Sequence, residues 1–141
     1  VVGVSGGGAA DDAGLQLALE RAARVLHPGA RAVVLADPAS ALAVPAAVWS
    51  ALSMHVEVQL ILLVDRLETD PPHCLLPVAT PAGRMRFDLA AEGVRQSWHE
   101  ALVGPMETLL RQLPGRRVRV TPLASDQASD AWLGASAQGA Y

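Results

Sequence analysis

Three acidic side chains stand at positions where this chain could bind a ligand or transfer a proton. Asp37 directly follows an apolar run at residues 31–36, and Asp65 and Glu68 follow a second apolar run at residues 56–64. Ligands of open α/β sheets bind beyond the carboxyl ends of the strands, and two carboxylates can share acid–base work. No nucleophile or histidine lies near them in the sequence, so Asp65 and Glu68 are predicted to accept hydrogen bonds from loop amides.

A glycine-rich segment suggests a second kind of chemistry. Residues 5–8 (S-G-G-G) precede a helical pattern, the order in which phosphate-binding loops are built. The segment also resembles the S-G-G-x-D-S loop of ATP pyrophosphatases, but residues 8–10 read G-A-A where x-D-S is required, and no G-K-[ST] follows. A linker is therefore expected, and a small nucleotide- or phosphate-binding enzyme that uses this loop is the alternative function.

Histidine and cysteine form no metal-binding or nucleophilic pattern in the sequence. The four histidines make neither an H-x-x-x-H pair nor an H-E-x-x-H motif, so zinc binding is not expected. The single cysteine, Cys74, has no lysine or arginine near it in the sequence and precedes two leucines, which favours a buried structural thiol over a nucleophile. We therefore expect no catalytic residue and no cofactor.

The hydrophobic pattern predicts which elements position these residues. Apolar residues at spacings of three and four indicate helices, and continuous apolar runs indicate buried parallel strands. The predicted order is a helix from residue 11 to 26, a strand at 31–36, a helix at 44–53, a strand at 56–64, a loop at 65–73, a hairpin at 75–79 and 84–89, a helix at 91–113 kinked at Gly104-Pro105, a strand at 117–123 and a helical turn at 126–133. This alternation predicts an α/β three-layer sandwich. It forms a single domain at residues 11–133, between a flexible segment at 1–10 and a disordered tail at 134–141.

Several short motifs in this order resemble a known family. They are V-D-R-L-E at 64–68, P-A-G-R-M-R-F-D at 81–88, R-Q-S-W-H-E at 95–100, and L-x-x-A-x-R-V-L-H-P-G-A-R-A-V-V-L-A-D at 19–37. From residue 14 to 133 the chain resembles the C-terminal half of the MoxR-associated family called domain of unknown function fifty-eight, which carries a von Willebrand factor A-like domain. The resemblance implies a partial Rossmann-like sheet with a small hairpin, and a MoxR-type AAA+ ATPase as partner.

The same resemblance makes Asp37 a weak candidate for a metal ligand. Asp37 matches the aspartate that completes a metal-ion-dependent adhesion site, although the family's S-D-F signature is replaced by A-D-P here. The D-x-S-x-S loop, which supplies the main Mg²⁺ ligands in such domains, has no counterpart in the sequence. One carboxylate does not provide the several oxygens that Mg²⁺ needs, so Asp37 is predicted to cap the turn before Pro38.

The composition limits the class of protein. The 141 residues carry a net charge of −3 and include no lysine, and the only basic cluster is Arg116, Arg117 and Arg119. Nucleic-acid binding depends on many phosphate contacts, so it is not expected. No apolar stretch is long enough to span a bilayer, there is no signal-peptide pattern, and a single cysteine fits a reducing compartment. Cytoplasmic localisation is therefore expected.

Low charge and high hydrophobicity together predict self-association. The chain is 51% hydrophobic and only 18% charged, so part of its surface is expected to be covered in a homodimer or higher oligomer. With no catalytic constellation in view, the leading hypothesis is a non-enzymatic protein-interaction module. A structural fragment without independent activity is a third possibility.

Overall fold

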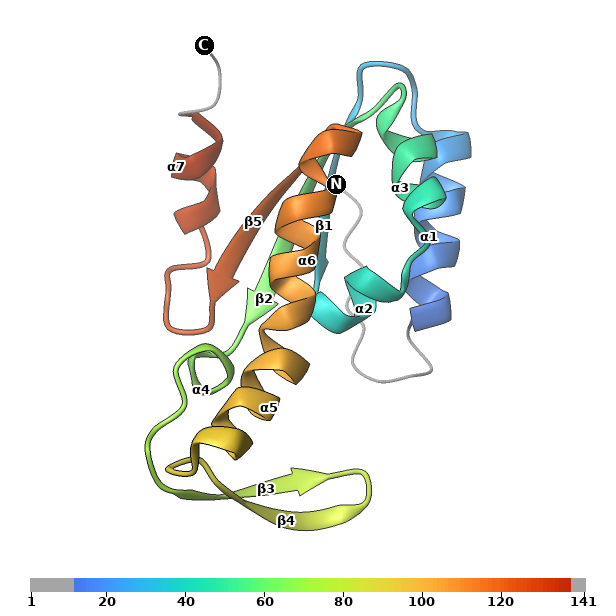
Figure 1. Cartoon of the computed structure of the whole chain (residues 1–141). Helices are drawn as coiled ribbons and strands as arrows, with labels where there is room; N and C mark the ends of the chain where they lie inside the picture. The colour runs from blue at the N-terminus through green and yellow to red at the C-terminus, as the bar shows by residue number, and fades with distance from the viewer. Residues whose placement is uncertain (1–11, 138–141) are drawn as a thin grey trace.

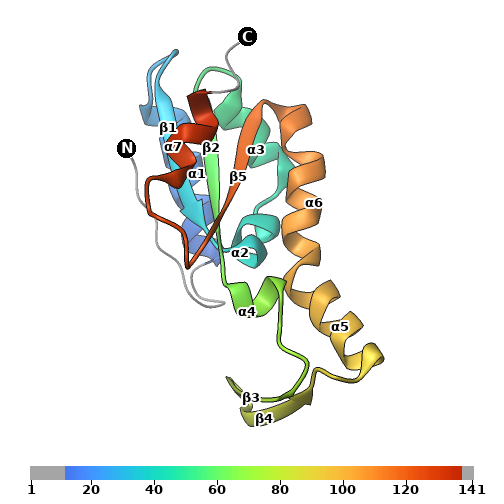
Figure 2. The same ribbon diagram turned by 90° about the vertical axis from the view of Figure 1, so that its left-hand side faces the viewer.

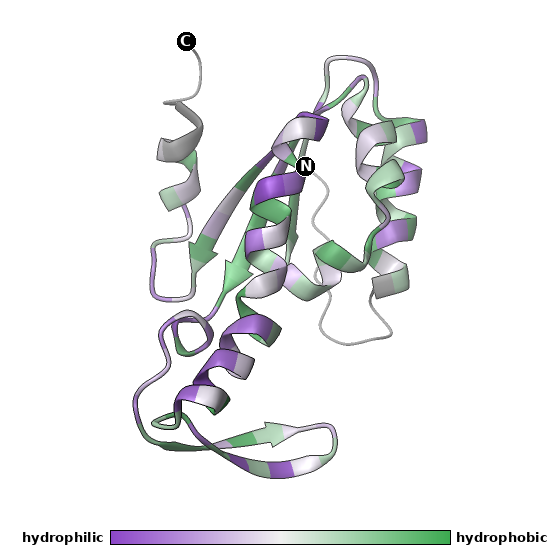
Figure 3. Cartoon of the chain, viewed as in Figure 1, coloured by the Kyte–Doolittle hydropathy of each residue, from purple (hydrophilic) through white to green (hydrophobic). Residues whose placement is uncertain are grey.

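Apolar, mostly β-branched and leucine residues build a parallel sheet at the centre of the fold. In the computed structural model, which describes residues 12–137, three strands lie parallel in the order β1 (Arg31–Ala36), β2 (Glu57–Val64) and β5 (Val118–Ala124) (Figure 1). β2 is the central strand and is hydrophobic along most of its length (Figure 3). The predicted parallel strands are therefore confirmed, and with them the mixed α/β class.

Four helices cover one face of this sheet. They are α1 (Asp12–Val25), α2 (Pro38–Ala43), α3 (Ala46–Ser53) and α6 (Gly104–Gln112). Alternate strand residues such as Val34, Leu60 and Val118 point toward them, and these side chains form one buried cluster with Trp49 and Leu109. Side chains alternate between the two faces of a strand. This cluster therefore contains every second residue of the three strands, and the residues between them lie on the opposite face.

The opposite face carries α7 (Ala131–Ala137) in the described part of the chain (Figures 1 and 2). Ile61 is fully buried there, whereas Leu63, two residues further along the same strand, is 45% exposed. Gln59 lies on this face as well, and its amide donates to the Thr121 hydroxyl at 2.8 Å. This face is therefore apolar but covered only in part by the helices of residues 12–137.

A separate unit interrupts the path from β2 to β5. It consists of α4 (Arg66–Thr69), the antiparallel hairpin of β3 (Leu75–Thr80) and β4 (Gly83–Asp88), and α5 (Glu92–Leu102). The hairpin projects from the end of the molecule, away from the parallel sheet (Figures 1 and 2). Gly83 has a φ of 117°, a left-handed conformation that favours glycine, which explains why the turn falls there. The predicted hairpin is confirmed.

Helix boundaries differ from the sequence prediction where proline decides them. The predicted kink at Gly104-Pro105 is a break between α5 and α6, because Pro105 has no amide hydrogen to donate to the preceding turn. The predicted helix at 44–53 is α3, but α2 and α4 were not predicted. Both are short helices, capped by aspartates. The last helix includes residues 134–137, which the sequence assigns to the tail.

Two further expectations concern the whole chain. The predicted flexible segment at 1–10 lies outside the described residues. Within residues 12–137, no helix is both long and apolar enough to cross a membrane.

Candidate functional site

The carboxyl ends of the parallel strands bring the three predicted site residues together. Asp37, Asp65 and Glu68 line one pocket of about 430 Å³, which continues over the ends of β2 and β5 to Ser125 and Gln127. Asp37 follows β1 and Asp65 follows β2, so the position of both carboxylates is a direct result of neighbouring parallel strands ending at the same edge. The acidic cluster is thus a product of the sheet.

Asp37 and Asp65 each cap a short helix. The Ser40 amide donates to Asp37 Oδ2 at 3.0 Å, and the Leu67 amide donates to Asp65 Oδ1 at 2.8 Å. Asp37 stands at the N-cap of α2 and Asp65 at the N-cap of α4, where a carboxylate satisfies an amide that the helix leaves unpaired. The predicted capping role of Asp37 and the predicted loop-amide bond to Asp65 are confirmed.

Glu68 lies near the other two carboxylates, which makes its ionised form less favourable. Burial raises the pKa of the Glu68 carboxyl above its ordinary value, and the neighbouring charges of Asp65 and Asp37 raise it further. An interaction with the Asp65 backbone amide partly offsets this increase in the pKa. None of the three carboxylates forms an ion pair with a residue in the described range, so the cluster carries negative charge that no described basic side chain neutralises.

An ion pair joins two segments next to residues that line this pocket. Arg66 donates to Asp126 Oδ2 at 2.6 Å, and Asp126 raises the pKa of Arg66 through that hydrogen bond and its charge. The bond links the first turn of α4 to the loop after β5. Arg66 therefore faces Asp126 rather than the acidic cluster.

The acidic cluster does not have the arrangement of a metal site. Among residues 12–137 no group of three or more His, Cys, Asp or Glu side chains is placed to hold a metal ion. Asp37 and Asp65 already use one oxygen each for capping. Together with the lack of a D-x-S-x-S loop in the sequence, the residues present do not fit the magnesium site that the resemblance implies for Asp37.

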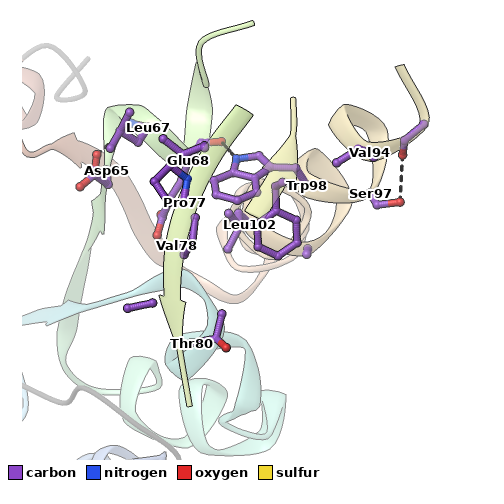
Figure 4. A pocket seen from close by; sticks show the side chains of 15 residues that line it. Asp65, Leu67, Glu68, Pro77, Val78, Thr80, Val94, Ser97, Trp98 and Leu102 are labelled. Carbon is purple, nitrogen blue, oxygen red and sulfur yellow. Dashed lines mark hydrogen bonds between the residues drawn. The ribbon is translucent and has the colours of Figure 1, made fainter. Parts of the chain in front are cut away.

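A second, larger pocket lies next to the first. This groove of about 830 Å³ runs between β3 and α5, and Asp65 and Glu68 line its mouth as well (Figure 4). Trp98 anchors it: its indole Nε1 donates to the Glu68 carbonyl at 3.2 Å, and its ring meets Phe87 edge-on at 5.6 Å between centroids. Most of the other lining side chains are apolar. Apart from Asp65 and Glu68, the sequence prediction includes no residue of this groove.

Cysteine and histidine are placed away from both pockets. Cys74 is exposed in the loop before β3, so the predicted buried thiol is wrong. Cys74 lies directly before β3 and its carbonyl accepts from the Leu89 amide at 3.0 Å, so it extends a hairpin whose side chains are mostly exposed. His55 contacts the Ala23 carbonyl at 3.1 Å and His99 lies 3.3 Å from Glu107. The glycine-rich residues 5–8 lie outside the described part of the chain.

Comparison with known proteins adds no relative. No protein-family model, curated protein or solved structure matches the chain. The fold and the two adjoining pockets are therefore the basis on which a function can be inferred.

Proposed function

We propose that this chain is a non-enzymatic protein-interaction module built like the C-terminal half of a von Willebrand factor A-like domain. In a doubly wound sheet of strand order 3-2-1-4-5-6, the strands of the second half follow one another in space. Right-handed crossovers that step in one direction place their helices on one face. The order β1-β2-β5, with α1, α2, α3 and α6 on one face, is the observation that supports the proposal.

The same topology suggests a surface for self-association. In a complete doubly wound sheet, another strand would pair with the outer edge of β1, and further helices would cover the second face. In the described part of the chain, β1 pairs only with β2, and Leu63 remains 45% exposed on the second face. Free strand edges and apolar faces are usually covered. We infer that copies of the chain associate through this edge and face as a homodimer or higher oligomer.

A second partner follows from the family resemblance. The motifs between residues 19 and 100 resemble a MoxR-associated family, which makes a MoxR-type AAA+ ATPase the partner that we propose. In such a pair the ATPase supplies nucleotide hydrolysis. The chain proposed here supplies binding surface, which needs no catalytic constellation of its own.

The test has two arms: the mass of the protein in solution and its melting temperature in the presence of ligands. Size-exclusion chromatography with light scattering at micromolar concentration is expected to give an oligomer. The substitution Leu63→Asp is expected to shift it toward the monomer. Met54→Asp is the matched control, because Met54 is 79% exposed at the end of α3, outside the proposed surface, and this change is expected to leave the mass unchanged.

The second arm addresses the alternative function. A ligand that binds the native state raises the melting temperature by mass action. We expect no shift with ATP, Mg²⁺ or Mn²⁺. A monomeric wild-type protein would contradict the self-association, and a saturable shift with ATP would replace the proposal with a nucleotide-binding function of residues 5–8.

A further inference from the structure

The groove between β3 and α5 runs along the outer edge of the hairpin. Five consecutive residues of β3, from Leu76 to Thr80, line one wall, whereas only Phe87 of β4 contributes. A pocket over one face of a strand would be lined by every second residue. Consecutive lining residues instead place the groove beside the strand, where its backbone is accessible. Figure 4 shows Asp65, Leu67 and Glu68 near one end of β3 and Thr80 at the other.

The opposite wall is one face of α5. Val94, Trp98 and Leu102 follow at spacings of four, and Ser97 and Ala101 lie beside them. Residues four apart stand above one another on a helix, so these side chains form a continuous ridge that lines the groove. The two walls are thus a strand edge and a mostly apolar helix face.

The pairing of the hairpin identifies which backbone groups face the groove. The Leu89 amide donates to the Cys74 carbonyl at 3.0 Å, and the register continues with Leu75 opposite Asp88. Hydrogen-bonded and non-hydrogen-bonded pairs alternate in an antiparallel ladder. Leu75, Pro77 and Ala79 therefore direct their backbone groups away from β4. The position of Pro77 fits this alternation, because proline has no amide hydrogen and in a strand it lies where the ladder needs none.

These edge groups have no partner strand in the described part of the chain. β3 pairs only with β4 between residues 12 and 137. Three carbonyls, of Leu75, Pro77 and Ala79, and two amides, of Leu75 and Ala79, are therefore available to a further strand. Strands in a sheet lie roughly 4.8 Å apart, which a groove beside β3 can accommodate.

We propose that the groove binds an extended, apolar segment of a partner protein, which adds a strand to β3 and places an arginine or lysine near Asp65 and Glu68. This inference rests on the proposed interaction function and names its binding mode. Charge complementarity selects the occupant: Asp65 and Glu68 line the groove, and neither forms an ion pair with a described residue. A basic side chain of the segment supplies the missing countercharge.

An extended segment fits the walls better than a helix does. A strand satisfies the outward-facing carbonyls and amides of β3 through its own backbone, and its alternate side chains contact Trp98 and Val94. A helix has already satisfied its own backbone groups, so it would cover the β3 edge without bonding to it.

The probe is a phage-displayed library of random octapeptides, selected on the full chain. The expected consensus has apolar residues at alternate positions and one arginine or lysine near an end. The best sequence is then made as a fluorescein-labelled peptide, and its affinity is measured by fluorescence anisotropy. A library that yields no enrichment, or that yields helical spacing of apolar residues, overturns the proposal.

Backbone substitutions in β3 provide the sharpest control. Ala79→Pro removes one outward amide and is expected to weaken the peptide about five- to tenfold, the effect of one hydrogen bond. Pro77→Ala adds an outward amide and is expected to strengthen binding by about two- to fivefold. Both positions are exposed, and both form non-hydrogen-bonded pairs with β4, so neither substitution removes a hydrogen bond of the hairpin. Equal affinity of both variants and the wild type would exclude strand addition.

Two side-chain variants test the walls of the groove. Ser97→Trp fills the groove from α5 and is expected to abolish binding. Glu68→Gln is expected to remove the preference for arginine or lysine over a neutral residue in the peptide while leaving the apolar preference. A preference that survives Glu68→Gln and also Asp65→Asn overturns the charge assignment.

The outcomes distinguish this proposal from the function on which it rests. Self-association is proposed through Leu63 and the β1 edge, so Ala79→Pro is expected to leave the mass in light scattering unchanged. If the peptide fails to bind while Leu63→Asp still lowers the mass, the groove proposal alone fails. If Ala79→Pro itself yields the monomer, the groove is occupied by a second copy and the proposed occupant is wrong.

Discussion

At the residue scale, Asp37 caps α2 through one carboxylate oxygen, a role that does not need a negative charge in principle. Its Oδ2 accepts from the Ser40 amide at 3.0 Å, and asparagine caps a helix about as well as aspartate does. Asp37→Ala is expected to lower the free energy of unfolding by about 1 kcal/mol, and Asp37→Asn by no more than a few tenths of that. Urea unfolding of the three proteins checks this. A loss in Asp37→Asn as large as that in Asp37→Ala would mean that the negative charge itself is required.

Glu68 makes the stability depend on pH in a direction opposite to that of most carboxylates. Its pKa in the folded protein is raised above the ordinary value of 4.5 by burial and by Asp65 and Asp37. Between 4.5 and that raised pKa the folded state holds a proton that the unfolded state has released, so the contribution of Glu68 to stability falls as pH rises. It is lowest where Glu68 is ionised in both states.

Replacing this carboxyl by an amide is therefore expected to stabilise the protein at neutral pH. Glu68→Gln should raise the free energy of unfolding at pH 7 by less than about 1 kcal/mol, because water screens a half-buried charge. At pH 4 the gain should vanish. Urea unfolding of both proteins at pH 4, 5.5 and 7 measures the difference. A difference that is independent of pH would show that Glu68 carries no electrostatic penalty.

The residue scale also shows what local sequence can and cannot predict. The capping role of Asp37 was predictable because an aspartate before proline is a local signal. The exposure of Cys74 was not, since two following leucines look like the start of a buried strand, whereas the hairpin exposes Leu75 to 54%. The meeting of Glu68 with Asp37 depends on two strands separated in the sequence. The two residues are brought close because β1 and β2 pair in parallel and end at the same edge of the sheet.

At the element scale, α6 packs one face against the sheet, and two adjacent leucines differ in burial because only one of them lies on that face. Leu109 is 2% exposed in the core cluster, while Leu110 is only partly buried. Leu109→Ala is expected to lower the free energy of unfolding by about 2–5 kcal/mol, as buried leucine truncations do. Leu110→Ala should cost less than half as much. Thermal and urea unfolding of this pair measures both, and equal losses would mean that α6 is rotated relative to this description.

Element types followed from periodicity wherever the elements were long. β1 and β2 are nearly continuous apolar runs, which is typical of parallel strands buried on both faces. α2 and α4 contain six and four residues, too few for a helical period to appear in a window of about 11–18 residues. The groove was not predictable, because it depends on how the hairpin lies relative to α5. No local pattern specifies that orientation.

At the scale of the whole molecule, the two parts of the fold should differ in local stability. β2 pairs on both sides and is buried along most of its length, whereas the hairpin has a single pairing and mostly exposed side chains. Isolated two-stranded hairpins are marginally stable. Hydrogen exchange is expected to be at least about a hundredfold faster for the hairpin amides than for those of β2. Uniform exchange across both would show that the hairpin and the sheet open together.

The separation of β2 from β5 along the chain has a consequence for the order of folding. The side chains of Arg31 and Glu57, which bond across β1 and β2, belong to residues 26 apart in the chain. Those of Gln59 and Thr121, which bond across β2 and β5, belong to residues 62 apart. Closing the longer loop costs about 0.8 kcal/mol more in chain entropy. Contacts between distant residues also form more slowly. The transition state is therefore expected to contain the β1–α3–β2 unit, with β5 docking as the late step.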